Sequence, residues 1–208
     1  HSKGNARLST EVHRLAKQHF NNSDLYTFEK QHANKLLLDN YEYWKSIVQK
    51  SEDPFATAAK LAVIGNIIDY GAHIVLDDIS KQIEELYKQD LKINMTQELK
   101  QAVKQADNVL YLGDNCGEVV LDKLFIETID HPNLTFAVRG KPVINDVTLD
   151  DARAVGIDRV CNVISNGTDA PSTLLEFCSD EFVEAFNKSD LIISKGQGNF
   201  EGLMNNPH

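Results

Sequence analysis

The sequence has few of the residues that mark disulfide-rich, zinc-binding or membrane-spanning proteins. Its 208 residues include only three cysteines, Cys116, Cys161 and Cys178. Their odd number and irregular spacing match neither a disulfide framework nor a zinc pattern, so we expect reduced thiols. No apolar run is long enough to span a bilayer, and no signal peptide is visible. These absences predict a cytoplasmic protein.

Positive charge is also scarce. The chain has 21 Lys and Arg residues against 31 Asp and Glu residues, which gives a formal net charge of -10. Such a surface repels nucleic-acid phosphates and anionic membranes, so we expect neither as a partner. An anionic substrate would need a cation, or a local group of basic side chains, to reverse the electrostatic field at its site.

The hydrophobic pattern changes its period along the chain. Apolar residues at helical spacing predict helices in the first part, over residues 9–20, 24–50, 55–70 and 79–89. Short apolar runs predict strands in the second part, at residues 109–112, 134–138, 160–164 and 191–193. Helical patterns separate these runs, at residues 118–129, 148–155 and 180–187.

Strands that alternate with helices favour βαβ units and a parallel sheet. The strands are almost continuously apolar, which fits a sheet covered on both faces. We therefore predict an α/β fold in which a helical part, residues 1–92, precedes a mostly parallel sheet in residues 93–208.

Polar residues and glycine follow every predicted strand. The carboxyl ends of parallel strands share one edge of a sheet, and ligands bind at that edge in open α/β sheets. Four polar segments are therefore expected to meet there: Gly113 to Glu118, Arg139 to Asp146, Ser165 to Asp169, and Ser194 to Asn199.

The residue types in these segments suit a phosphoryl group held with a metal ion. Asp114, Asn115 and Asp146 offer the hard oxygen ligands that Mg²⁺ or Mn²⁺ prefer, and no histidine lies near them in the sequence. Gly117 opens the following helix, whose free N–H groups favour an anion. Arg139 and Lys195 would add positive charge at the site.

Simpler interpretations of the same residues stay open. Asp114 and Asn115 are common turn and helix-capping residues, and Asp146 could cap the helix that begins near residue 148. Arg139 and Lys195 could be ordinary surface charges.

The segment from Gly113 is neither a complete dinucleotide-binding fingerprint nor a P-loop. Cys116 is a poor candidate for a nucleophile, because no histidine is placed to activate it.

One polar pair lies in a strongly apolar helix. Asn66 and Asp69 are three residues apart, so they share a face, and a buried polar pair is costly without partners. They either cap the helix near Gly71 or face a substrate. Gly65 indicates that another backbone packs closely against this helix.

The motifs together resemble one known family, the metal-dependent damage-control phosphatases, catalogued earlier as domain of unknown function 89. The resemblance is strongest to the archaeal and bacterial branch and extends from about Thr10 to about Leu203. It rests on these segments, in this order: Gly65-Asn66-x-x-Asp69; Gly113-Asp114-Asn115-x-Gly117-Glu118 with Asp122; Arg139-Gly140-x-Pro142 with Asn145-Asp146-x-Thr148; and Lys195-Gly196-x-Gly198-Asn199-x-Glu201.

The resemblance implies a helical N-terminal part packed on a Rossmann-like three-layer α/β/α sandwich. It implies a divalent metal, Mn²⁺, Co²⁺, Ni²⁺ or Mg²⁺, bound by Asp114, Asn115 and Asp146. It also implies hydrolysis of small phosphorylated metabolites, such as sugar phosphates or damaged metabolites. Asp114, Asp146 and Lys195 are then the expected catalytic residues. The expected substrate-binding residues are Asn66, Asp69, Gly117, Arg139, Gly196, Asn199 and Glu201.

The chain also departs from the family pattern. It lacks the Cys-x-x-Cys motif that microbial members usually carry near the N-terminus. Members usually continue into a further strand after the segment that matches Glu201 to Leu203, so we expect this chain to be part of a longer protein. The attacking group could be a metal-bound water or an aspartate.

Two other functions fit the same residues. One is a methyltransferase that uses S-adenosylmethionine on carboxyl groups, and it would require no metal. The other is a protein that binds a phosphorylated metabolite without turning it over. Sensitivity of activity to a chelator separates the first from a phosphatase, and phosphate release separates the second.

Overall fold

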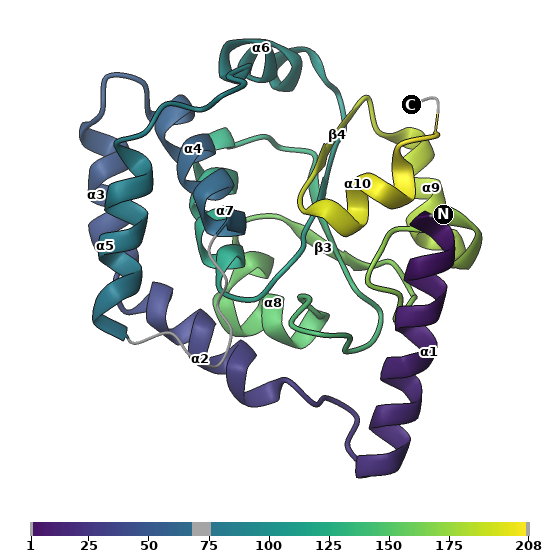
Figure 1. The fold of residues 1–208 in the computed structure, drawn as a ribbon. Helices are drawn as coiled ribbons and strands as arrows, with labels where there is room; N and C mark the ends of the chain where they lie inside the picture. Colours follow the sequence, from purple (N-terminus) through teal and green to yellow (C-terminus); the bar gives the residue numbers. More distant parts are fainter. Residues whose placement is uncertain (1, 68–75, 207–208) are drawn as a thin grey trace.

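A parallel sheet forms the centre of the protein in a computed structural model that describes residues 2–67 and 76–206 (Figure 1). Its strands are β1 (Val109–Leu112), β2 (Leu134–Val138), β3 (Asn162–Ser165) and β4 (Leu191–Ser194). They lie in the order β3-β2-β1-β4, and every pair is parallel. All four predicted strands are present. β3 begins later than predicted because Val160 and Cys161 bond back to Ile157, in the 3-10 turn η1 (Ile157–Arg159).

The two faces of the sheet are both covered, as the apolar strands predict. Successive side chains of a strand point to opposite faces. Val109 and Tyr111 belong to the larger hydrophobic cluster, whereas Leu110 and Leu112 pack with Phe182 in a second cluster on the other face. This arrangement confirms the three-layer α/β/α architecture.

Helices α7 (Glu118–Ile129) and α8 (Leu149–Val155) contribute to the larger cluster, and α4 (Pro54–Ile67) packs against α7. Gly65 makes the contact between α4 and α7 possible. A Cβ atom there would lie 3.1 Å from the Cβ of Glu118, so the two helices approach closely, as the glycine predicts.

The remaining helices extend this arrangement. The second face of the sheet packs on α9 (Asp180–Lys188) and α10 (Gln197–Leu203), near the short turn η2 (Leu175–Phe177). On the first face, α2 (Thr27–Leu38), α3 (Tyr41–Lys50) and α5 (Leu76–Tyr87) complete the layer with α4. Helix α6 (Thr96–Gln105) leads into β1 and also contacts α4.

The helical pattern of the first part is divided differently from the prediction. The single pattern over residues 24–50 forms two helices, because the chain turns at Asp39 and Asn40 between α2 and α3. Helix α1 (Ser2–Phe20) lies apart from α3 and α5 and contacts α10 instead (Figure 1). Among the described residues, no helix is long and apolar enough to cross a membrane.

The sheet order defines where a ligand site is expected. The chain passes from β1 to β2 and β3 on one side and then returns to place β4 on the other side of β1. Such a reversal opens a crevice at the carboxyl ends of the two strands that flank it. The loops after β1 and β4 therefore meet at this position.

Candidate functional site

The loop after β1 brings its two polar side chains to the crevice. The Asp114 carboxylate accepts hydrogen bonds at Oδ2 from Asn66 Nδ2 at 3.1 Å and from Asn115 Nδ2 at 2.8 Å. Neither Asp114 nor Asn115 caps α7, whose N-cap residue is Gly117 and which has no side-chain capping bond. The structure therefore rules out the simple capping interpretation of these two residues.

The loop after β2 places Asp146 beside them. Asn115 and Asp146 form an isolated antiparallel bridge. In this bridge Val147 donates its N–H to Asp114 O at 2.8 Å, and Cys116 donates to Asn145 O at 2.8 Å. The three predicted metal ligands thus come together at one edge of the sheet.

The cap of α8 is not Asp146 but Thr148, which forms a capping box with Asp151. This leaves the Asp146 carboxylate available for another role. The bridge between the two loops is made of backbone hydrogen bonds, so it fixes the loops without using the carboxylates of Asp114 and Asp146.

Burial raises the pKa of both carboxyl groups. The pKa of Asp146 rises to about 6, chiefly because the group is buried, although Arg139 acts in the opposite direction. The Asp114 charge raises the pKa of Asp146 further. The pKa of Asp114 is itself raised, again mainly by burial. A cation placed between them would favour the ionised form of both groups.

The oxygen atoms of Asp114, Asn115 and Asp146 are of the kind that a hard divalent cation prefers, but they come from few acidic side chains. Among residues 2–67 and 76–206, no group of three or more His, Cys, Asp or Glu side chains could hold a metal ion. The predicted set has only two carboxylates, Asp114 and Asp146, and its third member is the amide of Asn115. Two carboxylates and an amide oxygen suit Mg²⁺ or Mn²⁺ better than a softer metal ion.

Arg139 supports Asp146 inside the protein. Its side chain is 3% exposed and donates from Nε to Asp146 Oδ2 at 2.6 Å. The two terminal nitrogens donate to Thr173 Oγ1 at 3.1 Å and to Asn199 Oδ1 at 2.9 Å. All three side-chain nitrogens of Arg139 are therefore bonded within the protein, and one of these bonds orients Asp146.

Asn199 is also used internally. Its Oδ1 accepts from Arg139 and from Thr173, while its Nδ2 donates to Gly113 O at 3.1 Å and to Lys195 O at 2.8 Å. The side chain is fully buried. Asn199 therefore connects the loops after β1, β2 and β4 rather than facing a cavity.

Lys195 is paired with two acidic side chains of α7. Its Nζ lies 2.6 Å from Asp122 Oδ1 and 3.6 Å from Glu118 Oε1, and it donates to Ala62 O at 3.0 Å. Burial alone would lower the pKa of Lys195, but Asp122 and Glu118 outweigh it and raise the pKa. The lysine thus stays charged beside its internal partners.

The two acidic partners of Lys195 each keep a buried oxygen atom without a hydrogen-bond donor. Burial raises the pKa of Glu118 to about 8. Glu118 Oε1 and Asp122 Oδ2 are buried and have no hydrogen-bond partner, although Tyr111 donates to Asp122 Oδ1 at 2.7 Å. Glu118 accepts from Asn66 Nδ2 at 2.5 Å, so Asn66 connects this group to Asp114.

Gly196 permits the contact between the loops after β1 and β4. A Cβ atom at Gly196 would lie 1.9 Å from Asp114 Oδ2, and its backbone has φ of 79°. Only glycine tolerates both conditions. Asn66, Lys195 and Gly196 also line a cavity of about 450 Å³, whose walls include apolar side chains of α4 and α6. The cavity is thus lined by two residues next to Asp114, Asn66 and Gly196, and not by Asp114 itself.

Three other predicted substrate residues lie elsewhere or are already engaged. Gly117 donates its N–H to Asn34 Oδ1 at 2.6 Å, so this group is not directed at the crevice. Glu201 accepts from Gln197 Nε2 at 2.6 Å along the exposed side of α10. Asp69 lies outside the described residues.

Cys116 is buried, which raises the pKa of its thiol well above the ordinary value and fits the expectation that it is no nucleophile.

The sequence interpretation missed Lys30, Asn34 and Thr173, which contact the loops of the site. Lys30 and Asn34 are buried on α2 in the same stripe as Ala33 and Leu37. Two polar residues at core positions of an amphipathic helix are a recognisable signal, since such groups need buried partners. Thr173 lies in an irregular segment and carries no comparable signal.

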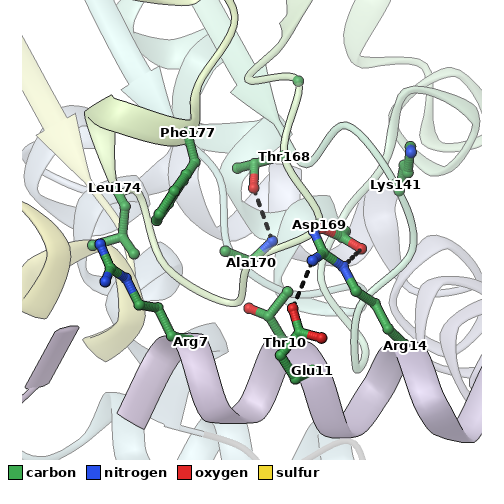
Figure 2. A pocket seen from close by; sticks show the side chains of 11 residues that line it. Arg7, Thr10, Glu11, Arg14, Lys141, Thr168, Asp169, Ala170, Leu174 and Phe177 are labelled. Atoms are coloured by element: carbon green, nitrogen blue, oxygen red, sulfur yellow. Dashed lines mark hydrogen bonds and ion pairs between the residues drawn. The ribbon is translucent and has the colours of Figure 1, made fainter. Parts of the chain in front are cut away.

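A second cavity, of about 620 Å³, lies between α1 and the segment from Gly167 to Phe177 (Figure 2). It is lined in part by two of the predicted polar segments, through Lys141 and Gly167 to Asp169, but by none of the described residues predicted to be catalytic, metal-binding or substrate-binding. Figure 2 shows Arg14 of α1 directed at Asp169, to which it donates two hydrogen bonds. Its cationic side chain is therefore already paired with an acidic one.

The fold and the loops define a class: a doubly wound α/β protein whose acidic and amide side chains gather at the carboxyl edge of a parallel sheet. A family model described as the damage-control phosphatase ARMT1-like domain matches residues 3–208. The chain therefore belongs to the damage-control phosphatase family.

Individual relatives agree with this assignment. An uncharacterised protein of Methanocaldococcus jannaschii is 36% identical over 204 residues, which cover 95% of this chain and 67% of that protein. A damage-control phosphatase of Pyrococcus horikoshii is 42% identical over 76% of this chain and 56% of its own length. A damage-control phosphatase of Archaeoglobus fulgidus is 34% identical over 96% of this chain and 70% of its own length.

A solved structure gives the same result. The crystal structure of a DUF89 family protein from Pyrococcus horikoshii has a TM-score of 0.84 to this chain at 34% identity. The similarity covers 96% of this chain and 70% of that chain. The chain thus spans between 56% and 70% of the length of these relatives.

Proposed function

We propose that this chain carries the active site of a divalent-metal-dependent phosphatase that acts on small phosphorylated metabolites. The observation that supports the proposal is the bridge between Asn115 and Asp146, which joins the loops after β1 and β2 at the carboxyl edge of the sheet. The names of the two phosphatase relatives support the same reaction class.

Asp114, Asp146 and the amide oxygen of Asn115 would hold the metal, which we propose to be Mn²⁺, Co²⁺, Ni²⁺ or Mg²⁺. A divalent cation bound there would stabilise the negative charge that develops on the transferred phosphoryl group. Arg139 holds Asp146 through its Nε, and Asn66 holds Asp114 through its amide. These contacts orient the carboxylates before any ligand arrives, which reduces the cost of reorganisation during the reaction.

The substrate would lie next to Asp114. Asn66 and Gly196 line the adjoining cavity, which agrees with their expected roles in binding the substrate. Lys195 contributes positive charge to the wall of this cavity, although its Nζ is bonded to Asp122. We propose sugar phosphates or damaged phosphorylated metabolites as substrates. The description of the family as damage-control phosphatases supports the second of these only at the level of the reaction class.

Replacing Asp114 with alanine tests the proposal. The variant loses one of three protein ligands, so metal-dependent turnover should fall by at least about a hundredfold. Phosphate release is measured from a panel of small phosphate esters with each of the four metals, with and without a chelator. Asp150→Ala is the matched control, because the Asp150 side chain is 95% exposed on α8, and it should retain the wild-type rate.

The outcomes separate the alternatives. A wild-type rate in the Asp114→Ala protein would contradict the site assignment. Activity of the wild-type protein on a methyl donor that survives the chelator would support a methyltransferase instead. Thermal stabilisation by phosphate esters without phosphate release would support a binding protein.

A further inference from the structure

Helix α2 connects the helical part of the protein to both loops that carry the proposed metal ligands. Figure 1 shows α2 below α7 and beside α8, and α2 packs against both. Lys30 and Asn34 are one helical turn apart, so they share a face of α2. They are only 2% and 6% exposed, although both are polar, which means that their burial requires specific partners.

Asn34 contacts the loop after β1. Its Oδ1 accepts the N–H of Gly117 at 2.6 Å, and the pair is buried. Gly117 has φ of 89° and follows closely on the segment of Asp114 and Asn115. The bond therefore fixes the peptide that ends the ligand loop and begins α7.

Lys30 contacts the segment after Asp146. Its Nζ lies 2.6 Å from Asp151 Oδ2 and 2.9 Å from Asp24 Oδ2. The Asp151 carboxylate also accepts from the N–H of Thr148 at 2.9 Å and from its hydroxyl at 2.6 Å. Lys30 thus holds the capping box of α8, which begins shortly beyond Asp146.

The two contacts reach the two loops that carry one proposed ligand set. The loop after β1 carries Asp114 and Asn115, and the loop after β2 carries Asp146. A metal site tolerates only small errors in ligand position, on the order of 0.5 Å. We infer that Lys30 and Asn34 are positioning residues that hold these two loops, joined to each other by the backbone bridge between Asn115 and Asp146, in place against α2. This inference rests on the proposed function.

The main alternative is a purely structural role, in which Lys30 and Asn34 only hold α2 on the sheet layer. Lys45 provides a control for that role. It joins α3 to α7 through a 2.9 Å contact to Glu127, near the end of α7 remote from the ligand loops. Lys45→Met therefore loosens the same helical layer without touching Asp114, Asn115 or Asp146.

The test measures Mn²⁺ binding by isothermal titration calorimetry and Tm by thermal unfolding, on the full chain. Asn34→Ala and Lys30→Met should weaken Mn²⁺ binding by about 10 to 100-fold, the usual effect of removing a residue that supports a metal ligand. Lys30→Arg keeps the charge and the hydrogen bond, so it should restore most of the affinity. Lys45→Met should stay within about twofold of the wild-type affinity, with only a small loss of Tm.

Amide hydrogen exchange of the metal-free protein adds a readout that does not involve the metal. Asn34→Ala should speed exchange at Gly117, and Lys45→Met should not. If either main variant fails to fold, Asn34→Ser or Lys30→Gln replaces it and is held to the same criterion.

Two results would overturn the inference. One is Mn²⁺ affinity within about twofold of wild type in both variants. The other is an equal loss of affinity in Lys45→Met at a matched loss of Tm. If the wild-type protein itself neither binds Mn²⁺ nor releases phosphate, the proposed function fails and not only this inference. The wild-type titration is therefore performed first.

Discussion

Two neighbouring pairs of carboxylates differ in access to solvent at one member, and we expect this difference to separate binding from folding. The loop pair, Asp114 and Asp146, follows β1 and β2; Asp114 is only partly buried, whereas Asp146 is buried. The helix pair, Glu118 and Asp122, lies on α7 and is fully buried. Each pair has one basic partner, Arg139 for the loop pair and Lys195 for the helix pair.

The charges of the two pairs are not balanced by these partners. With all four carboxylates ionised, the two basic side chains leave excess negative charge in a largely buried region. Proteins relieve such an excess by protonation or by binding a cation. The pKa of about 8 at Glu118 favours its protonated form in the helix pair, whereas the divalent ion that we propose would relieve the excess charge of the loop pair.

The largest expected effect follows from breaking the helix pair. Lys195→Met leaves Asp122 and Glu118 buried without their cation, so the free energy of unfolding should fall by about 3–5 kcal/mol. Urea denaturation of the metal-free protein measures this loss. Lys45→Met is the control, because its partly exposed ion pair is worth about 1 kcal/mol or less.

The Lys195→Met variant can also contradict the assignment of the helix pair to folding. If Lys195→Met is as stable as Lys45→Met but has lost phosphate release, then Lys195 acts on the substrate, as the sequence predicts, and its contacts to α7 are secondary. If stability and activity both fall, activity is measured again at a low temperature at which the variant is folded. Recovery of activity there would show that Lys195 stabilises the fold and does not act on the substrate.

Much of the fold could be predicted because its signals are local. The strands at residues 109–112 and 134–138 and the helix at 118–129 coincide with the prediction. Their apolar runs and bounding turn residues need no knowledge of distant contacts. The break between α2 and α3 was missed, since the helical pattern continues across Asp39 and Asn40 while the chain turns there.

The site could be predicted in part. Asp114, Asn115 and Asp146 come together because parallel strands share a carboxyl edge, and this rule can be applied to a sequence. The partners of Arg139 and Asn199 could not be foreseen, because Thr173 reaches them from an irregular segment. Nor could the pairing of Lys195 with Asp122, because it depends on how α7 rotates against β4.

A pH titration sharpens the comparison between the two pairs. The pKa of Glu118 is raised from 4.5 to about 8 in the folded protein, so the folded state holds a proton that the unfolded state has lost between these pH values. The contribution of Glu118 to stability is therefore complete below about pH 4.5 and is lost as pH rises through about 8. The slope is at most about 1.4 kcal/mol per pH unit.

Glu118→Gln isolates this contribution. The free energy of unfolding of the metal-free wild-type protein should fall between about pH 6 and about pH 8 more steeply than that of the variant. The introduced amide would keep an oxygen for Asn66, so the hydrogen bond is retained. Parallel curves for the two proteins would show that Glu118 is already ionised at the lower pH and that the helix pair is not relieved by protonation.

The smallest expected effect concerns Glu201, which the sequence assigns to the substrate and the structure pairs with Gln197. An exposed pair one helical turn apart contributes only about 0.2–0.5 kcal/mol. Glu201→Gln should therefore leave Tm and the KM for phosphate esters nearly unchanged. A several-fold rise in KM with unchanged Tm would instead place Glu201 against the substrate. In that case α10 belongs to the binding site together with the loop pair, and access to solvent alone does not distinguish binding residues from folding residues.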